Sequence, residues 1–172
     1  MKDLGPILGH LKASRAKLLA AAEKVSDLRW RDSPQPGRWS AAEVIAHVGM
    51  IEDTTIFGMK RLLRSTPKPV RLRKLLHLPV AIAAWRGRKL RTPIPLDAKR
   101  VRDKQESLAG LVAMRQATCE FIESTRGTDV SVYRYKHPFL GSLNMYEWFR
   151  LIGYHELRHA KQIRELLETF HV

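Results

Sequence analysis

The sequence has a single cysteine, Cys119, among its 172 residues. One thiol excludes an internal disulfide, and it also excludes a zinc site built from several thiolates. A bound metal must therefore be held by imidazole or carboxylate groups. The chain also lacks a run of roughly 20 apolar residues that could span a bilayer. Its first residues lack the long apolar core and the small-residue cleavage site of a secretory leader. We expect a cytoplasmic protein.

Acidic residues are scarce in the middle of the chain. The sequence has 31 basic and 17 acidic residues, which gives a net charge of +14. The segment from Lys60 to Lys104 holds 15 of the basic residues, and its only acidic residues are Asp97 and Asp103. Nearly all of the excess charge therefore lies in one local patch. The length suits one hydrophobic core, so residues 1–172 are expected to form a single domain.

Apolar residues recur at helical spacing in four stretches, which predicts four long amphipathic helices. The stretches span about residues 3–28, 40–65, 103–127 and 144–172. Ser40 with Glu43, and Asn144 with Glu147, have the spacing of a capping box at a helix start. Four such helices around one core predict an all-α four-helix bundle.

Prolines and glycines interrupt the basic segment between the second and third of these helices. Pro79, Gly87, Pro93 and Pro95 prevent one long regular element there. We expect a long basic excursion that contains a short helix or two. A strand-like fragment is expected at 130–135, in the connection before the last helix.

The last helix contains "HELRH", which fits the H-E-x-x-H pattern of zinc proteases. His155 and His159 are four residues apart, so both imidazoles leave the same face of the helix and can meet one ion. That face is also the apolar one, and two neutral histidines buried there would each need hydrogen-bond partners. Metal ligation is the favoured interpretation, and a hydrogen-bonded pair of core histidines is the alternative.

A third histidine, His47, lies on the inward stripe of the second helix, between Val44 and Ile51. Sites in helix bundles are built from side chains of facing helices that converge in the core. Three imidazoles would leave a coordination position open, as in a catalytic site. Imidazole binds zinc, nickel, copper and iron, so the ligands do not select the metal. The other histidines are expected to face solvent, and His137 is the one that could fold over the mouth of the site. They are His10, His77, His137 and His171.

The residues downstream of the motif argue against a protease. In zincins a third ligand lies beyond the second histidine, after a turn or on another helix. Here only 13 residues come after His159, and they contain no glycine and continue the helical pattern. Glu165 and His171 are the late candidates, and neither lies beyond a turn.

The chain resembles the DinB (YfiT-like) superfamily of helical-bundle proteins. The resemblance rests on "PGRWSAAEVIAHV" around His47 and on "HPFLGSLNMYEWFRLIGYHELRHAKQI" around the other two histidines. It implies an up-down-down-up bundle and a divalent metal, zinc or nickel, on His47, His155 and His159. Glu156 stands where relatives often have Asp, which suggests a tolerated neighbour rather than a base.

The resemblance also implies a reaction class. Members of this superfamily that do chemistry use low-molecular-weight thiols as transferases or isomerases. An ion held by histidines lowers the pKa of a coordinated thiol or water, so a nucleophile is available at neutral pH. We expect a metal-dependent thiol S-transferase or hydrolase that acts on a small molecule.

Several residues near the histidines have a structural and a functional interpretation. Gln162 and Glu156 flank the histidines, and either could orient them through a hydrogen bond. For Glu156 a solvated face is the favoured interpretation. Trp39 is expected to set the entry of the second helix, and Trp148 to pack in the core. Tyr154 and Arg158 are candidates for the border of a pocket.

The basic segment has three interpretations. It could be a solvated lid or a dimer element, it could bind an anionic small ligand, or it could bind nucleic acid or an anionic membrane. The sequence has no helix-turn-helix, zinc finger or aromatic-basic strand motif. We favour the lid or dimer element and expect a homodimer. A non-enzymatic stress or binding protein that uses this basic surface is the alternative to an enzyme.

Overall fold

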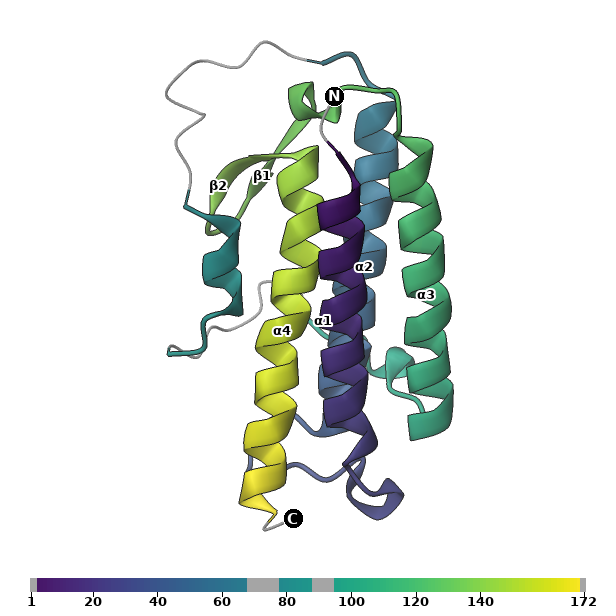
Figure 1. Ribbon diagram of the computed structural model, residues 1–172. Coiled ribbons are helices and arrows are strands. Elements are labelled where there is room, and N and C mark those ends of the chain that lie inside the picture. The colour runs from purple at the N-terminus through teal and green to yellow at the C-terminus, as the bar shows by residue number, and fades with distance from the viewer. Residues whose placement is uncertain (1–2, 68–77, 88–94, 171–172) are drawn as a thin grey trace.

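The computed structural model describes residues 3–67, 78–87 and 95–170. It contains four long helices (Figure 1). They are α1 (Gly5–Glu23), α2 (Ala41–Leu63), α3 (Lys104–Ser124) and α4 (Met145–Thr169). The predicted four-helix bundle is thus confirmed.

The two predicted capping boxes are both present and fix the starts of α2 and α4. The Ser40 side chain accepts from the backbone N–H of Glu43, and the Glu43 carboxylate accepts from the backbone N–H of Ser40. Asn144 and Glu147 make the same reciprocal pair at α4. These bonds satisfy backbone donors that a helix start leaves without intrahelical partners.

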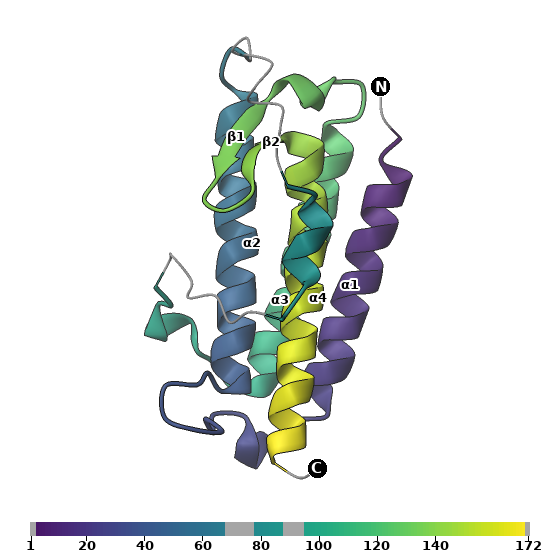
Figure 2. The ribbon, with the colours of Figure 1, turned by 90° about the vertical axis from the view of Figure 1, so that its left-hand side faces the viewer.

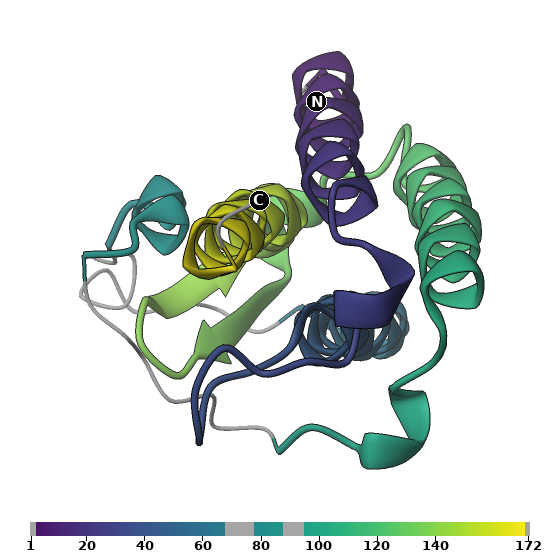
Figure 3. The same cartoon turned by 90° about the horizontal axis from the view of Figure 1, so that it is seen from below.

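The helices run down, up, up and down, which is the up-down-down-up order that the family resemblance implied (Figure 1). Seen along the bundle, α1 and α2 occupy opposite corners, and α3 and α4 occupy the other two (Figure 3). Each helix therefore packs against two neighbours around one core. Because α2 and α3 are parallel, the chain between them must travel the length of the bundle.

The described part of that connection includes a short 3₁₀ helix, Val80–Ala84, which packs against the outer side of α4 (Figure 2). A second 3₁₀ turn, Ala98–Arg100, precedes α3. Residues 68–77 and 88–94, which carry much of the basic charge and His77, lie outside the described residues. The long basic excursion as a whole therefore stays a prediction.

A β-hairpin precedes α4, where the sequence predicted a strand-like fragment at 130–135. The strands are β1 (Arg134–His137) and β2 (Gly141–Asn144), paired antiparallel with Arg134 opposite Asn144. The fragment was placed too early, because Val130 is fully buried and begins a 3₁₀ turn before β1 starts. Gly141, at φ +93°, ends the turn of the hairpin in a conformation that favours glycine.

The first helix is shorter than the predicted stretch of residues 3–28. It ends at Glu23, and a 3₁₀ turn at Asp27–Arg29 then brings Trp30 into the core at 2% exposure. The indole of Trp30 donates to the carbonyl of Arg102, and the Trp30 carbonyl accepts from the N–H of Ala42. These contacts anchor the connection from α1 to α2. In the described part of the chain, no helix is both long and apolar enough to cross a membrane.

Candidate metal centre

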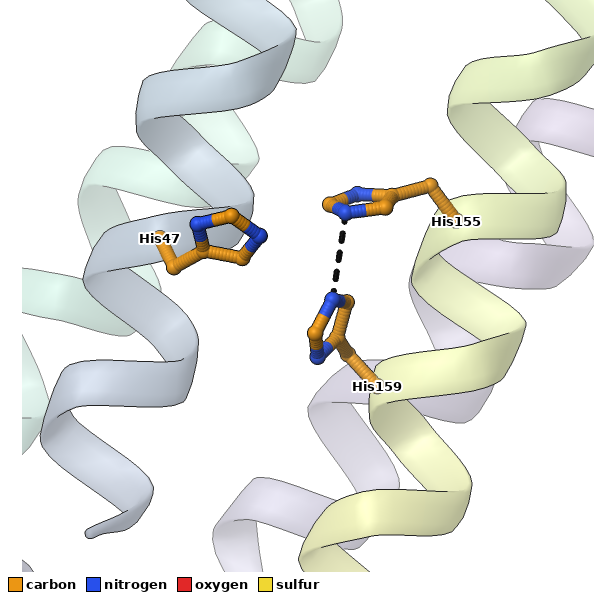
Figure 4. A group of neighbouring side chains, drawn as sticks. All are labelled: His47, His155 and His159. Atoms are coloured by element: carbon orange, nitrogen blue, oxygen red, sulfur yellow. Dashed lines mark hydrogen bonds between the residues drawn. The ribbon is translucent and has the colours of Figure 1, made fainter. Parts of the chain in front are cut away.

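His47 of α2 and His155 and His159 of α4 converge in the space between their helices (Figure 4). One ring nitrogen from each histidine lies within 4.8 Å of those of the other two. The two nitrogens on α4, His159 Nε2 and His155 Nε2, are 3.1 Å apart. Nitrogens that bind one ion at about 2.0–2.1 Å lie about 3 Å apart when they are neighbouring ligands. The spacing on α4 therefore fits a shared ion.

All three imidazoles are held in the neutral form, which is the form that binds metal. Burial lowers the pKa of His47 from 6.5 to about 4. Burial, with His47 and Arg158 adding repulsion, lowers the pKa of His155 to about 3. The pKa of His159 is also lowered well below its usual value, first by burial and then by the two other histidines. At neutral pH the cluster therefore carries lone pairs and no charge.

A hydrogen bond to Gln162 fixes the tautomer of His159. Its Nδ1 lies 2.9 Å from Gln162 Oε1, and the same oxygen accepts from Arg86 Nη1 at 3.1 Å. A guanidinium only donates, so the amide atom between the two must be the oxygen and His159 Nδ1 must carry the proton. His159 Nε2 is then an unprotonated nitrogen that faces His155 and His47. Gln162 thus has the orienting role that the sequence suggested.

His47 directs its Nε2 toward His155 and His159 (Figure 4). Its other ring nitrogen, Nδ1, is buried and has no hydrogen-bond partner within the described ranges. Its ring packs 4.8 Å from the Trp39 ring, centroid to centroid, and 5.0 Å from that of His159. Trp39 at the entry of α2 therefore also holds the ring of His47 in the site. Three neutral imidazoles are a donor set that zinc and nickel accept.

Glu156, expected on a solvated face, is fully buried in the core, on a different face of α4 from His155. Its carboxylate accepts from Ser14 Oγ and Arg15 Nε, both at 2.6 Å, and lies 2.9 Å from Arg115 Nη2. The solvated placement was wrong because successive helical residues point about 100° apart. That rotation directs Glu156 toward α1 and α3 while His155 faces α2.

One signal in the sequence indicates that Glu156 is buried. Arg115 lies on the inward stripe of α3, between Leu111 and Ile122, where an apolar residue is the norm. A cation buried in a bundle core requires a buried carboxylate. The orientation of Glu156 also removes it as the general base of a zinc protease, since it is bound to two arginines away from the histidines.

A cavity of about 1350 Å³ opens beside the three histidines, between α2 and α4. Residues of the hairpin and of the Val80–Ala84 helix line it. Figure 2 shows this short helix alongside α4. Arg158 borders it, as expected. Trp148 is partly buried and packs against the core, as expected, and it also lines the cavity. Tyr154 does not line it; its ring lies 4.4 Å from that of His10, centroid to centroid.

Two of the other histidines are not solvent-exposed. For His137 this agrees with the alternative that it folds over the mouth of the site, and for His10 it differs from the expectation. His137 lines the cavity, and its Nδ1 accepts from the backbone N–H groups of Phe139 and Leu140, both at 3.1 Å. His10 is partly buried and its Nε2 lies 3.2 Å from the Arg150 carbonyl oxygen. His77 and His171 lie outside the described residues. Cys119 is a partly buried residue of α3, and burial raises the pKa of its thiol.

The model of one protein family, the DinB superfamily, matches residues 10–163, a span that includes all three histidines. The chain belongs to the DinB superfamily. The resemblance found in the sequence is thereby confirmed. Among curated proteins, the chain is 26% identical over 145 residues to YuaE of Bacillus subtilis (strain 168), described as uncharacterized. That alignment covers 84% of this chain and 86% of YuaE.

Two solved structures share the fold. YfiT from Bacillus subtilis, described as a probable metal-dependent hydrolase with an unusual four-helix bundle topology, superposes with a TM-score of 0.67 at 18% identity. The alignment covers 96% of this chain and 86% of YfiT. TT2238, described as a four-helix bundle protein, superposes with a TM-score of 0.61 at 24% identity, over 95% of this chain and 99% of that chain. At these identities the likeness shows a common fold.

Proposed function

We propose that this DinB-superfamily chain is a divalent-metal-dependent enzyme that acts on a small molecule in the cavity between α2 and α4. His47, His155 and His159 would hold the ion, zinc or nickel. The observation that carries the proposal is the convergence of three neutral imidazoles, whose ligand nitrogens lie within 4.8 Å of one another, at the wall of a large cavity. The description of YfiT as a probable metal-dependent hydrolase supports it.

The donor set favours catalysis over a structural role. Structural zinc sites are closed by four protein ligands, whereas catalytic sites keep a position for water or substrate. A divalent ion bound here would lower the pKa of a coordinated water or thiol. The proposed reaction is therefore hydrolysis, or transfer of a low-molecular-weight thiol to an electrophilic substrate.

The chain's own residues prepare the site in two ways. Gln162, held by Arg86, keeps the proton of His159 on Nδ1 and so keeps Nε2 available to the ion. His137 accepts two backbone N–H bonds at Nδ1, and burial lowers its pKa, so its neutral ring carries the proton on Nε2. That N–H is a fixed hydrogen-bond donor in the wall of the cavity.

The test is metal content followed by reaction screening. Purified protein should contain about one zinc or nickel ion per chain by mass spectrometry. Alanine variants of His47, His155 and His159 should each lose it while circular dichroism shows an intact helical fold. His10→Gln removes an imidazole outside the cluster and should keep the metal. Full metal content in His159→Ala would overturn the site.

The reaction screen separates the two chemistries. Metal-loaded protein is incubated with p-nitrophenyl esters for hydrolysis, and with glutathione or bacillithiol plus monochlorobimane for thiol transfer. Activity that disappears with the metal in the histidine variants assigns the reaction class. No metal-dependent activity in either assay would favour a non-enzymatic binding protein.

A further inference from the structure

We infer that the cavity beside the three histidines takes an amphipathic organic anion. Its apolar body lies along the aromatic wall, and its anionic group pairs with Arg158 next to His159. The inference rests on the proposed function only where it makes this anion the substrate of the metal site.

The wall of the cavity gathers apolar side chains that face solvent. Five of the large hydrophobic residues with an exposed surface line it, and they are between 44% and 61% exposed. These are Leu78, Ile82, Trp85, Tyr135 and Phe139. Large contiguous apolar patches on a folded chain mark binding surfaces. An apolar ligand body would remove this surface from water.

The length of the cavity suits an extended ligand. Along α2 the lining runs from His47 to Leu62, which is roughly 22 Å at the rise of an α-helix. Its volume of about 1350 Å³ exceeds the roughly 300–1,000 Å³ of most small-molecule pockets. An acyl chain or a fused aromatic body fits these dimensions better than a small polar metabolite does.

The charge of the cavity has one sign. Within residues 3–67, 78–87 and 95–170, its lining includes five cationic side chains and no carboxylate. The cations are Arg38, Arg61, Arg86, Lys136 and Arg158. A wall of low polarity that carries cations attracts an anion and discriminates against a cation.

Arg158 is the cation best placed to receive the anion beside the metal cluster. It precedes His159 and donates to the carbonyl oxygen of Trp85, which holds its guanidinium at the cavity wall. The neighbouring Arg86 is engaged in two bonds to Glu165, at 2.8 and 2.6 Å. An anionic group that binds beside Arg158 would therefore lie next to the metal cluster.

The test compares two fluorescent probes that differ in one anionic group. 8-Anilinonaphthalene-1-sulfonate carries a sulfonate, and N-phenyl-1-naphthylamine has the same aromatic body without it. The native chain should bind the sulfonate probe at one site per chain. Its affinity for this probe should be about tenfold higher than for the uncharged amine, since a charge-assisted pair contributes roughly that factor. Dodecanoate should displace the sulfonate probe.

Matched variants locate the charge and the apolar wall. Arg158→Gln should lower the affinity for the sulfonate probe alone and so remove the tenfold preference. Arg158→Lys should keep most of that preference. Arg64→Gln makes the same change of net charge outside the cavity and should leave both probes unaffected. Phe139→Ser should weaken both probes to a similar degree.

Equal affinity for the two probes, or an equal loss in Arg64→Gln and Arg158→Gln, would overturn the inference. Failure of both probes, with a concentration-dependent dimer in sedimentation, would instead assign the apolar wall to a second copy of the chain. Metal content is measured in the same samples. Metal without probe binding refutes this inference alone, and probe binding without metal refutes the proposed function alone.

Discussion

The guanidinium of Arg15 on α1 donates to the carboxylate of Glu156 on α4, with 2.6 Å between Nε and Oε1 and neither side chain more than 5% exposed. Arg115 of α3 and Glu52 of α2 complete the cluster, and Arg15 pairs with both carboxylates. Two cations and two carboxylates, one from each helix, are therefore neutralised in the core. The cluster fixes the rotation of α4, and that rotation turns His155 and His159 toward His47.

Breaking this cluster should destabilise the fold strongly. Glu156→Ala leaves Arg15 and Arg115 buried with one carboxylate between them, and loss of one partner of a buried pair costs about 3–5 kcal/mol. We expect that decrease in the free energy of unfolding, measured by urea denaturation. Glu168→Ala removes an exposed carboxylate from the same helix and should change the stability by less than about 0.5 kcal/mol. Similar values for the two variants would contradict the structural role of Glu156.

Acidification should destabilise the metal-free protein. Burial lowers the pKa of His47 to about 4 and that of His155 to about 3, whereas both are 6.5 in the absence of these effects. Between these values the unfolded chain binds protons that the folded chain does not, so the free energy of unfolding falls as the pH falls. The slope is at most about 1.4 kcal/mol per pH unit for each histidine.

The measurement is the melting temperature in EDTA from pH 7.5 to pH 4.5. The triple variant with glutamine at positions 47, 155 and 159 lacks these groups and should show a flatter profile. Identical profiles for the native chain and the triple variant would show that the histidines do not titrate as buried groups.

Loss of the hydrogen bond behind His159 should weaken metal binding. Gln162→Leu keeps the size of the side chain and removes the oxygen that accepts from His159 Nδ1. Partners of this kind contribute about 10–100-fold to metal affinity. We expect such a rise in the dissociation constant for zinc, measured by competition with a chromogenic chelator. Arg164→Gln, on the exposed face of α4, is the control and should bind zinc as the native chain does.

Gly153 of α4 is required because His10 of α1 occupies the space beside it. A Cβ at position 153 would lie 2.4 Å from His10 Nε2. The ring has little freedom to move, since it is bonded to the Arg150 carbonyl and packed against Tyr154. Gly153→Ala should therefore lower the free energy of unfolding by about 1–3 kcal/mol.

Two further variants test this reason. His10→Ala should rescue Gly153→Ala, which a double-mutant cycle measures as a coupling energy. Gly110→Ala places the same methyl group on α3, where nothing lies within 4 Å, and should stabilise the chain by about 0.5–1 kcal/mol. A destabilising Gly110→Ala, or a double variant no better than Gly153→Ala, would refute the clash with His10.

Features that depend on residues close in the chain were predictable from the sequence. Helix starts at Ser40 and Asn144 depend on side chains three residues apart, so the sequence alone predicts both capping boxes. The common face of His155 and His159 depends on helical geometry alone. The hairpin was only half predicted, because β2 pairs with β1 across a turn and has little apolar alternation of its own.

The sequence by itself determined four amphipathic helices, their caps and the pair of histidines on α4, because each of these depends on local spacing. Only the tertiary structure decided where Glu156 points and what Arg86 does. Glu156 lies in the core because arginines of α1 and α3 meet it there, and Arg86 reaches Gln162 from a segment 76 residues away. Such contacts depend on how the helices pack, and no periodicity in one helix encodes the charge on another.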